Sequence, residues 1–254
     1  MLTVFSSTGC IRCKIVKGYL MEHGIPYAEH DVTTEEGKAA FREFYHARRA
    51  SVKRDAQGIF FPVVQDGEAI VQDAGPCLAR FIAGEKLSEQ IAPSNLGHGW
   101  TGISLPLLPD SLEKAFCEVV SLMKKGGLQI EASTAGANPR LLEHLLSNRL
   151  IDRLKFEIKP EVDEMFLSMS LEAAAKHISE IDFRLYLDIA DLFDAGGQPP
   201  SASACGALAE RIRKSAGTGN MSFTLSCSSP QPLNLFPYRT AARRWLPKAD
   251  IASK

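Results

Sequence analysis

Ser7-Thr8-Gly9-Cys10-Ile11-Arg12-Cys13-Lys14 is the stretch that decides the fold of the first part of the chain. Residues 2–5 before it alternate apolar and polar side chains and predict a strand, whereas residues 14–21 place apolar side chains on one helical stripe. Cys10 therefore falls at a helix N-terminus, where unsatisfied amides and the helix dipole favour the thiolate. We expect Cys10 and Cys13 to form and break a disulfide by thiol exchange.

The residues that follow predict an alternation of helices and strands up to about residue 86. Residues 25–32 predict a second strand, and Thr33 with Glu36 resembles a capping box that opens the next helix. Asp66-Gly67 between two β-branched runs predicts a hairpin, and Gly75-Pro76 opens a last helix. The expected order is strand, helix, strand, helix, two hairpin strands and a helix.

A basic stretch lies between the second helix and the hairpin. Two interpretations are open for it: a solvated helix end and loop, which we favour, or a site for a phosphate or a substrate. Its members are Arg48, Arg49, Lys53 and Arg54.

These residues together resemble the glutaredoxin/thioredoxin family over residues 1–86, through the Cys-x-x-Cys, Phe61-Pro62 before the hairpin, and Asp73-Ala74-Gly75 at the last helix. The resemblance implies that Cys10 is the nucleophile and Cys13 the resolving thiol. It also implies that Pro62 is a cis-proline that packs against the thiols and shapes the substrate groove.

The resemblance further implies which residues line that groove and which partners it serves. We expect the groove to contain Pro62, Phe61, Arg12 and Asp73. Ser7 stands where glutathione-binding members usually carry a lysine, so glutathione is left open as a partner. We expect no cofactor to be required, and disulfides of proteins or small molecules to be the substrates.

The Cys-x-x-Cys has alternative interpretations as half of a zinc site, or as a ligand of a cluster or soft metal ion. No second Cys-x-x-Cys and no nearby Cys/His pair completes such a site. Redox chemistry is therefore favoured, and metal or iron–sulfur delivery is the alternative function.

The composition excludes several classes of partner and favours a cytoplasmic protein. The 254 residues carry a net charge of −1 and are 45% hydrophobic, which argues against nucleic acid or a membrane surface as the main partner. No apolar run reaches the ~20 residues of a membrane span, and the N-terminus does not resemble a signal peptide. Apart from Cys10 and Cys13 the cysteines are isolated, which suits a reducing cytosol.

Residues 87–98 predict a linker, and residues 99–254 predict a second domain with repeated strand-then-helix units. His98 beside Trp100 is an ordinary loop histidine in our interpretation. The alternation predicts a parallel sheet, either open or part of a (β/α) barrel, with ligands at the carboxyl ends of the strands. The expected strands are 100–105, 128–133, 154–158, 183–189 and 221–225, and the expected helices begin at Ser111, after Asn138, and span 170–181, 203–215 and 240–246.

One predicted strand carries charges on a single face. Lys155, Glu157 and Lys159 alternate with Phe156 and Ile158. Two interpretations remain open: a polar interior or cleft, or an edge strand with a solvated face.

This second domain resembles the radical-SAM activating enzymes of the glycyl-radical activase type over about residues 99–240. The resemblance is carried by residues 99–104, 130–136, 154–159 and 183–185, and it implies a partial barrel and a radical-SAM or glycyl-radical partner. The residues it places near a ligand are Glu131, Ser133, Glu157, Lys159 and Arg184.

Two elements of that family are missing from the sequence. There is no Cys-x3-Cys-x2-Cys, and Ser104-Leu105-Pro106 stands where the family has Gly-Gly-Glu. We therefore expect a degenerate domain without an iron–sulfur cluster and without radical chemistry. Binding of SAM or a nucleotide without catalysis remains a weaker alternative.

The C-terminal tail has a small aromatic-basic cluster at Arg243, Arg244 and Trp245. Nucleic-acid binding is the weaker interpretation, because docking of the tail back onto the second domain explains the same residues. The sequence as a whole favours a thiol–disulfide oxidoreductase whose second domain binds a substrate or partner.

Overall fold

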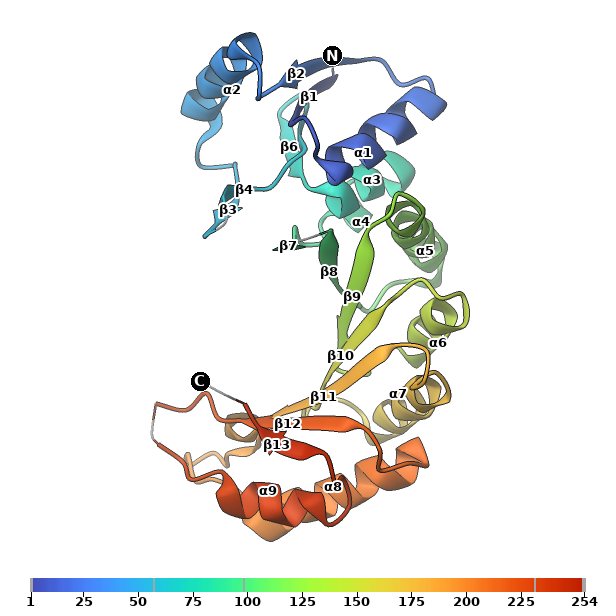
Figure 1. The fold of residues 1–254 in the computed structure, drawn as a ribbon, viewed down its shortest axis with the longest axis vertical. Coiled ribbons are helices and arrows are strands. Elements are labelled where there is room, and N and C mark those ends of the chain that lie inside the picture. Colours follow the sequence, from blue (N-terminus) through green and yellow to red (C-terminus); the bar gives the residue numbers. More distant parts are fainter. Residues whose placement is uncertain (1, 57, 98, 231, 253–254) are drawn as a thin grey trace. The chain divides into compact units, whose positions relative to one another are not determined.

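The protein is described here by a computed structural model that covers residues 2–56, 58–97, 99–230 and 232–252 (Figure 1). The chain divides into two compact units. The first comprises Met1–Ser104 and Leu108–Ile130, and the second comprises Leu105–Leu107 and Glu131–Lys254. His98 lies outside the described residues.

The first unit contains a four-stranded mixed sheet and five helices among the described residues. The sheet has the order β2-β1-β5-β6, in which β1 is parallel to β2 and antiparallel to β5. This arrangement confirms the predicted thioredoxin-like fold. The elements are β1 (Leu2–Ser6), α1 (Ile11–Glu22), β2 (Tyr27–Asp31), α2 (Glu35–Arg48), β3 (Arg54–Asp55), β4 (Gly58–Ile59), β5 (Val63–Asp66), β6 (Ala69–Gln72), α3 (Ala74–Ala83), α4 (Glu85–Ser88), β7 (Asn95–Gly97), β8 (Trp100–Ser104) and α5 (Asp110–Lys125).

Local sequence explains the β5–β6 hairpin and corrects one helix start. Gly67 has φ +62°, the left-handed conformation that its turn requires. The predicted cap Thr33 is wrong by one residue, because its hydroxyl donates to Asp31 instead. Thr34 is the N-cap of α2, and its hydroxyl accepts from the Gly37 amide at 3.0 Å.

Helix α5 covers α1 and α3 within the first unit. It buries an apolar face that includes Phe116, Val119, Val120 and Met123. The compact units thus place α5 with the thioredoxin-like elements. The linker predicted at residues 87–98 implies that the domains on either side of it fold independently, and this boundary stays a prediction.

The second unit is built from parallel strands joined by helices. Its elements, with β9 at its start, are β9 (Gln129–Thr134), α6 (Pro139–Ser147), β10 (Arg153–Glu157), α7 (Glu164–Lys176), β11 (Asp182–Asp188), the short 3-10 helix η1 (Ile189–Leu192), α8 (Ala202–Ala216), β12 (Ser222–Ser226), α9 (Phe236–Arg243) and β13 (Ala249–Ile251). The seven strands β7 to β13 follow one another in chain order in an open sheet. The open-sheet form of the prediction is therefore confirmed.

Two helices of this unit begin earlier than predicted, and its last strand was not predicted. Helix α7 was expected over 170–181 but begins at Glu164, because Asp163 caps it by accepting from the Met165 amide. The tail helix α9 begins at Phe236 rather than 240, with Pro237 in its first turn. The tail docks as expected, since α9 packs on α8 and β13 pairs with β12.

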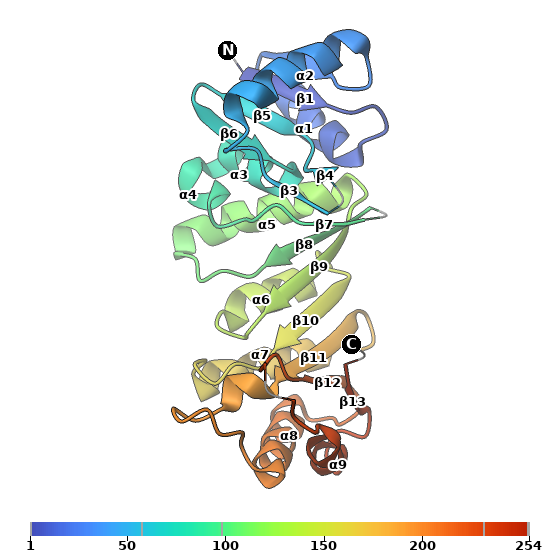
Figure 2. The same ribbon diagram turned by 90° about the vertical axis from the view of Figure 1, so that its left-hand side faces the viewer.

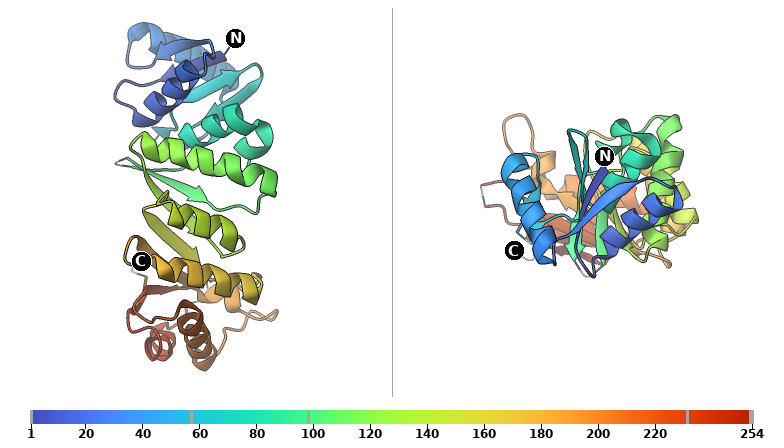
Figure 3. Two further views of the ribbon diagram at one scale, coloured as in Figure 1. Left: turned by 90° about the vertical axis from the view of Figure 1, so that its right-hand side faces the viewer. Right: turned by 90° about the horizontal axis from the view of Figure 1, so that it is seen from above.

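The two faces of the second unit's sheet differ in chemistry. Leu154 and Phe156 are fully buried on the face that α6 and α7 cover (Figure 3), because successive right-handed crossovers place helices on one side. Lys155 and Glu157 lie on the opposite face, where no described helix stands in front of β9 and β10 (Figure 2). Strand β10 pairs with both β9 and β11, so it is not an edge strand, but its charged face is partly exposed, as the solvated-face interpretation expected.

None of the described helices is both long and apolar enough to cross a lipid bilayer.

Candidate functional site

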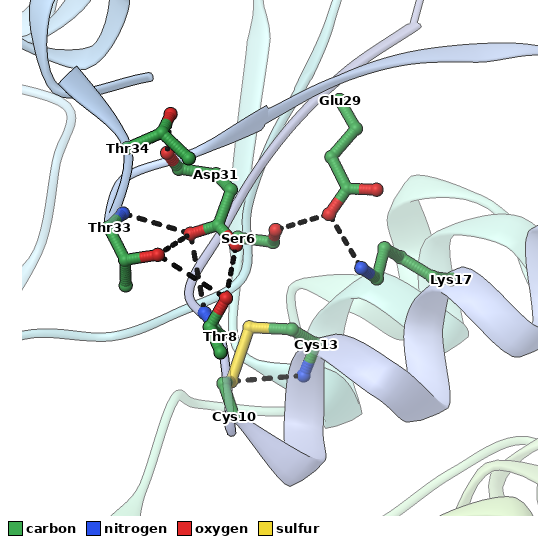
Figure 4. A network of polar contacts seen from close by, with 9 residues as sticks. All are labelled: Ser6, Thr8, Cys10, Cys13, Lys17, Glu29, Asp31, Thr33 and Thr34. Atoms are coloured by element: carbon green, nitrogen blue, oxygen red, sulfur yellow. Dashed lines mark hydrogen bonds and ion pairs between the residues drawn. A yellow bond between two sulfur atoms is a disulfide. The ribbon is translucent and has the colours of Figure 1, made fainter. Parts of the chain in front are cut away.

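Cys10 and Cys13 form a disulfide at the start of α1, with their Cα atoms 5.3 Å apart (Figure 4). Cys10 is the N-cap of α1, and its Sγ accepts a hydrogen bond from the Cys13 amide at 3.1 Å. Cys13 is 1% exposed, whereas Cys10 is only partly buried. The more accessible sulfur is therefore the one that the helix N-terminus stabilises as an anion.

The peptide bond between Phe61 and Pro62 is cis, as the family resemblance implied. The Pro62 carbonyl accepts from the Asp73 amide at 3.0 Å, which ties the start of β5 to the start of α3. A cavity of about 290 Å³ beside the disulfide brings most of the predicted groove together. It is lined by Ser7, Gly9, Cys10, Ile11, Arg12, Ile59, Phe60, Phe61 and Asp73.

Arg12, between the two cysteines, is held by a buried ion pair. Its Nε lies 3.1 Å from Asp73 Oδ1, and the two side chains are 10% and 2% exposed. The Nε–H is not aligned for a hydrogen bond to that oxygen, so the contact is electrostatic. The other end of the guanidinium donates to the Trp100 carbonyl of β8. Arg12 therefore connects the disulfide loop to both α3 and β8.

Asp73 occupies an unusual backbone conformation, with φ 71° and ψ 159°, a region that is essentially reserved for glycine. Its carboxylate compensates by accepting from the Ala74 amide at 2.7 Å and the Ser94 amide at 3.1 Å. Burial raises the pKa of Asp73, and Arg12 opposes that rise by stabilising the charged form. The carboxylate thus depends on Arg12 for its counter-charge.

A second polar network fixes the loop that precedes Cys10 (Figure 4). The Asp31 carboxylate at the end of β2 accepts from the Thr8 hydroxyl at 2.5 Å and from the Thr33 amide at 2.9 Å. The Thr8 hydrogen bond, followed by those from Thr33, lowers the pKa of Asp31 to about 2. Nearby, Glu29 accepts from Ser6 and Lys17. The loop before the disulfide is therefore attached to β2.

Replacing Asp31 by Asn is expected to weaken the acid dependence of folding. An acid whose folded pKa is depressed stabilises the fold above its unfolded pKa of about 3.8 and loses that contribution as the pH falls toward about 2. Urea midpoints measured at pH 5, 4, 3 and 2.5 should therefore fall less steeply in Asp31→Asn than in the wild type. Parallel curves for the two proteins would show that Asp31 has no such role.

Three of the other cysteines, Cys77, Cys117 and Cys205, are poor nucleophiles. Burial raises the pKa of Cys77 well above its ordinary value, and it raises the pKa of Cys117 and of Cys205 to about 11. Thiols with such pKa values are almost entirely protonated near pH 7. Cys10 and Cys13 are thus the best-placed pair for exchange chemistry among the described residues.

The residues predicted near a ligand in the second unit lie on or beside the uncovered sheet face. Glu131 pairs with Arg153 at 2.9 Å, Arg153 pairs with Asp182 at 2.8 Å, and Asp182 pairs with Arg184 at 2.7 Å. The structure therefore brings Glu131 and Arg184 into one chain of ion pairs. These charges are neutralised by neighbours across the strands and, for Asp182 with Arg184, within β11.

The other three predicted residues make further contacts. Glu157 pairs with Lys155 at 2.6 Å, and the Ser133 carbonyl accepts from the Leu105 amide at 2.9 Å. Lys159 follows β10 and pairs with Asp191 at 2.7 Å. Lys159 also lines a largely apolar cavity of about 510 Å³ beside α7 and α8. Its place at the carboxyl end of a parallel strand agrees with where ligands bind such sheets.

Sequence reasoning missed the residues that hold the site in place. Asp31, Ser94 and Trp100 contact it from elements outside the Cys-x-x-Cys helix. A local signal existed for Asp31 alone, since an Asp side chain commonly accepts from the residue two positions later, as in Asp31-Val32-Thr33. The contacts of Ser94 and Trp100 depend on pairings that no local pattern encodes.

Comparison with known proteins identifies the region around the disulfide. Residues 2–68 match the protein-family model described as Glutaredoxin, a range that contains Cys10, Cys13 and Pro62. No curated protein matches the chain. The match ends before residue 99, so the resemblance of the second domain to radical-SAM activating enzymes stays a prediction. Residues 2–68 are a Glutaredoxin-family domain, and this domain carries the Cys10–Cys13 disulfide.

Proposed function

We propose that the protein is a thiol–disulfide oxidoreductase that reduces disulfides through Cys10 and Cys13. The observation that carries the proposal is the Cys10–Cys13 disulfide at the N-terminus of α1, beside a cavity that Phe61 and Asp73 line, within a Glutaredoxin-family domain. Thiol pairs at helix N-termini exchange readily because the thiolate is stabilised there.

The reaction begins with the protein in its dithiol form. The Cys10 thiolate attacks one sulfur of a substrate disulfide, which forms a mixed disulfide and releases the other substrate sulfur as a thiolate. The Cys13 thiolate then attacks Cys10 Sγ and releases the second substrate thiolate. The substrate gains two electrons, the protein is left with the Cys10–Cys13 disulfide, and an external dithiol or glutathione restores the reduced form.

The second domain is proposed to bind the substrate or a partner protein without radical chemistry of its own. Support comes from the sequence resemblance over residues 99–240 combined with the missing cysteine triplet. We also propose that the protein is cytoplasmic and acts without a bound cofactor. Its proposed partner is a radical-SAM or glycyl-radical protein. The residues proposed to serve binding are Glu131, Ser133, Glu157, Lys159 and Arg184.

Replacing Cys13 by Ser is expected to stop the reaction halfway. Cys10 would still attack a disulfide such as that of 2-hydroxyethyl disulfide, but no second thiolate would release the product. Mass spectrometry of the reacted variant should show one covalently attached mercaptoethanol, removable by dithiothreitol. The wild type treated in the same way should carry none.

Anaerobic purification separates the proposal from metal or cluster delivery. A dithiol enzyme should be colourless, should contain no stoichiometric metal, and should take up two electrons per chain on reduction. A visible charge-transfer spectrum with bound iron, or stoichiometric colourless zinc, that is lost in Cys10→Ser would replace the redox function by metal binding.

A further inference from the structure

The first unit has a second cavity, of about 660 Å³, between α2 and the β3–β4 hairpin (Figure 1). Its aromatic lining comes from Phe61, Phe41 and Tyr45. The ring of Phe41 lies 5.4 Å from that of Phe61 and 6.0 Å from that of Tyr45, and all three side chains are partly exposed. These rings provide a continuous apolar surface of the kind that anchors ligands.

This aromatic surface leads to the reactive disulfide. Ile59 and Phe61 line both the larger cavity and the cavity that contains Cys10. Phe61 also directly precedes cis-Pro62. A ligand in the larger cavity can therefore extend along Phe61 toward the neighbouring cavity, which Cys10 lines.

The larger cavity has a basic rim. Lys38, Arg42 and Arg54 line it, against the one carboxylate of Asp55. Lys38 contacts Glu35 at 2.7 Å, but both side chains are exposed, so this pair is weak. A rim with an excess of positive charge in a chain of net charge −1 favours an anionic ligand.

The β3–β4 hairpin indicates that this ligand is a polypeptide. Arg54 pairs with Ile59 and Asp55 with Gly58, and among the described residues no third strand joins this two-stranded sheet. A two-stranded sheet offers backbone groups at its edges, to which an extended peptide can add as a further strand. A small anionic thiol would use the charges but not this edge.

We propose that the cavity between α2 and the β3–β4 hairpin binds an acidic polypeptide segment next to the disulfide that Cys10 reduces. The inference rests on the proposed function and specifies its substrate class. Aromatic rings contact the apolar side chains of the segment, and Arg42, Arg54 and Lys38 contact its carboxylates. Phe61 directs the segment to Cys10.

The test measures one attack step with synthetic peptides. Each peptide carries one cysteine as a mixed disulfide with nitrothiobenzoate, followed by residues that alternate Glu with Leu, Gln with Leu, or Lys with Leu. Cys10 of the reduced protein attacks the peptide sulfur and releases yellow nitrothiobenzoate. Cys13 then attacks Cys10 Sγ and releases the peptide thiol, which leaves the oxidised protein. The second-order rate constant is read from the nitrothiobenzoate absorbance at low ionic strength.

The Glu peptide is expected to react at least about tenfold faster than the Gln peptide, and the Lys peptide more slowly than both. The double variant Arg42→Gln/Arg54→Gln should lose this preference, as should the wild type in 0.5 M salt. The same variant should reduce 2-hydroxyethyl disulfide at the wild-type rate. Arg49→Gln is the matched control, because Arg49 is exposed at the end of α2 but does not line the cavity.

Two outcomes would overturn the inference while leaving the proposed function intact: equal rates for the three peptides, or a Glu preference that persists in the double variant. If glutathione slows the reaction of the Glu peptide in the wild type but not in the double variant, the basic rim binds a small thiol instead of a polypeptide. A protein that reduces neither the peptides nor 2-hydroxyethyl disulfide would instead remove the proposed function.

Discussion

Replacing Cys10 by Ser should lower the rate of disulfide reduction on the order of 10³-fold or more, to that of the uncatalysed exchange. A serine hydroxyl is not ionised at neutral pH and forms no disulfide, so the first attack is lost. Cys13, with 1% exposure, is too buried to replace it. The measurement is reduction of 2-hydroxyethyl disulfide under a dithiol reductant, with the variant's circular dichroism matched to the wild type.

Cys117→Ser is the control for this experiment. Cys117 is partly exposed on α5, and burial raises the pKa of its thiol to about 11. It should therefore leave the rate unchanged. A Cys10→Ser protein with the wild-type rate would mean that another group performs the reduction, and the assignment of Cys10 would be abandoned.

Replacing Arg12 by Leu should destabilise the first unit by about 3 kcal/mol at pH 7, because it leaves a buried carboxylate without its counter-charge. Asp73 is 2% exposed and would keep only its bonds from the Ala74 and Ser94 amides. The contact of Arg12 with the Trp100 carbonyl would be lost as well. The free energy of unfolding by urea, followed by circular dichroism and tryptophan fluorescence, measures the effect.

The loss in Arg12→Leu should shrink as the pH falls. Burial already raises the pKa of Asp73, and removal of Arg12 raises it further. An acid with a raised folded pKa destabilises the fold above its unfolded pKa and stops doing so once protonated. The difference from the wild type should therefore be smaller at pH 5 than at pH 8.

A double variant separates the charge effect from lost packing. Arg12→Leu/Asp73→Asn should be more stable than Arg12→Leu alone, because an amide needs no counter-charge and its oxygen still accepts at the start of α3. Arg49→Leu, at an exposed position, should change stability by no more than about 0.5 kcal/mol. If the double variant loses as much unfolding free energy as the two single variants together, the ion pair contributes nothing to stability.

The sequence predicted the elements around the disulfide well because their signals are local. The Cys-x-x-Cys after turn residues, Asp66-Gly67 between β-branched runs, and Asn138-Pro139 before an apolar helix each encode a turn or cap within a few residues. The errors at α7 and α9 were also local. There the cap Asp163 and the first-turn proline Pro237 lie outside the apolar periodicity that places the helices.

The basic stretch shows where local reasoning ends. Arg48, Arg49, Lys53 and Arg54 are equivalent as sequence, and a solvated loop was the favoured interpretation. In the structure Arg54 lines the aromatic cavity, whereas Arg48 pairs with Glu68 at 2.6 Å. Which arginine faces a cavity depends on how the β3–β4 hairpin folds against α2.

The sequence by itself determined the reactive pair, the thioredoxin-like order of elements and the repeated strand-helix units, since each follows from spacing along the chain. Tertiary structure alone decided that Arg12 is buried against Asp73 and Trp100, that α5 covers α1 and α3, and that a basic aromatic cavity adjoins Cys10. The bond from Arg12 to Trp100 alone joins residues 88 positions apart, and such contacts are selected by packing and desolvation rather than by neighbouring residues.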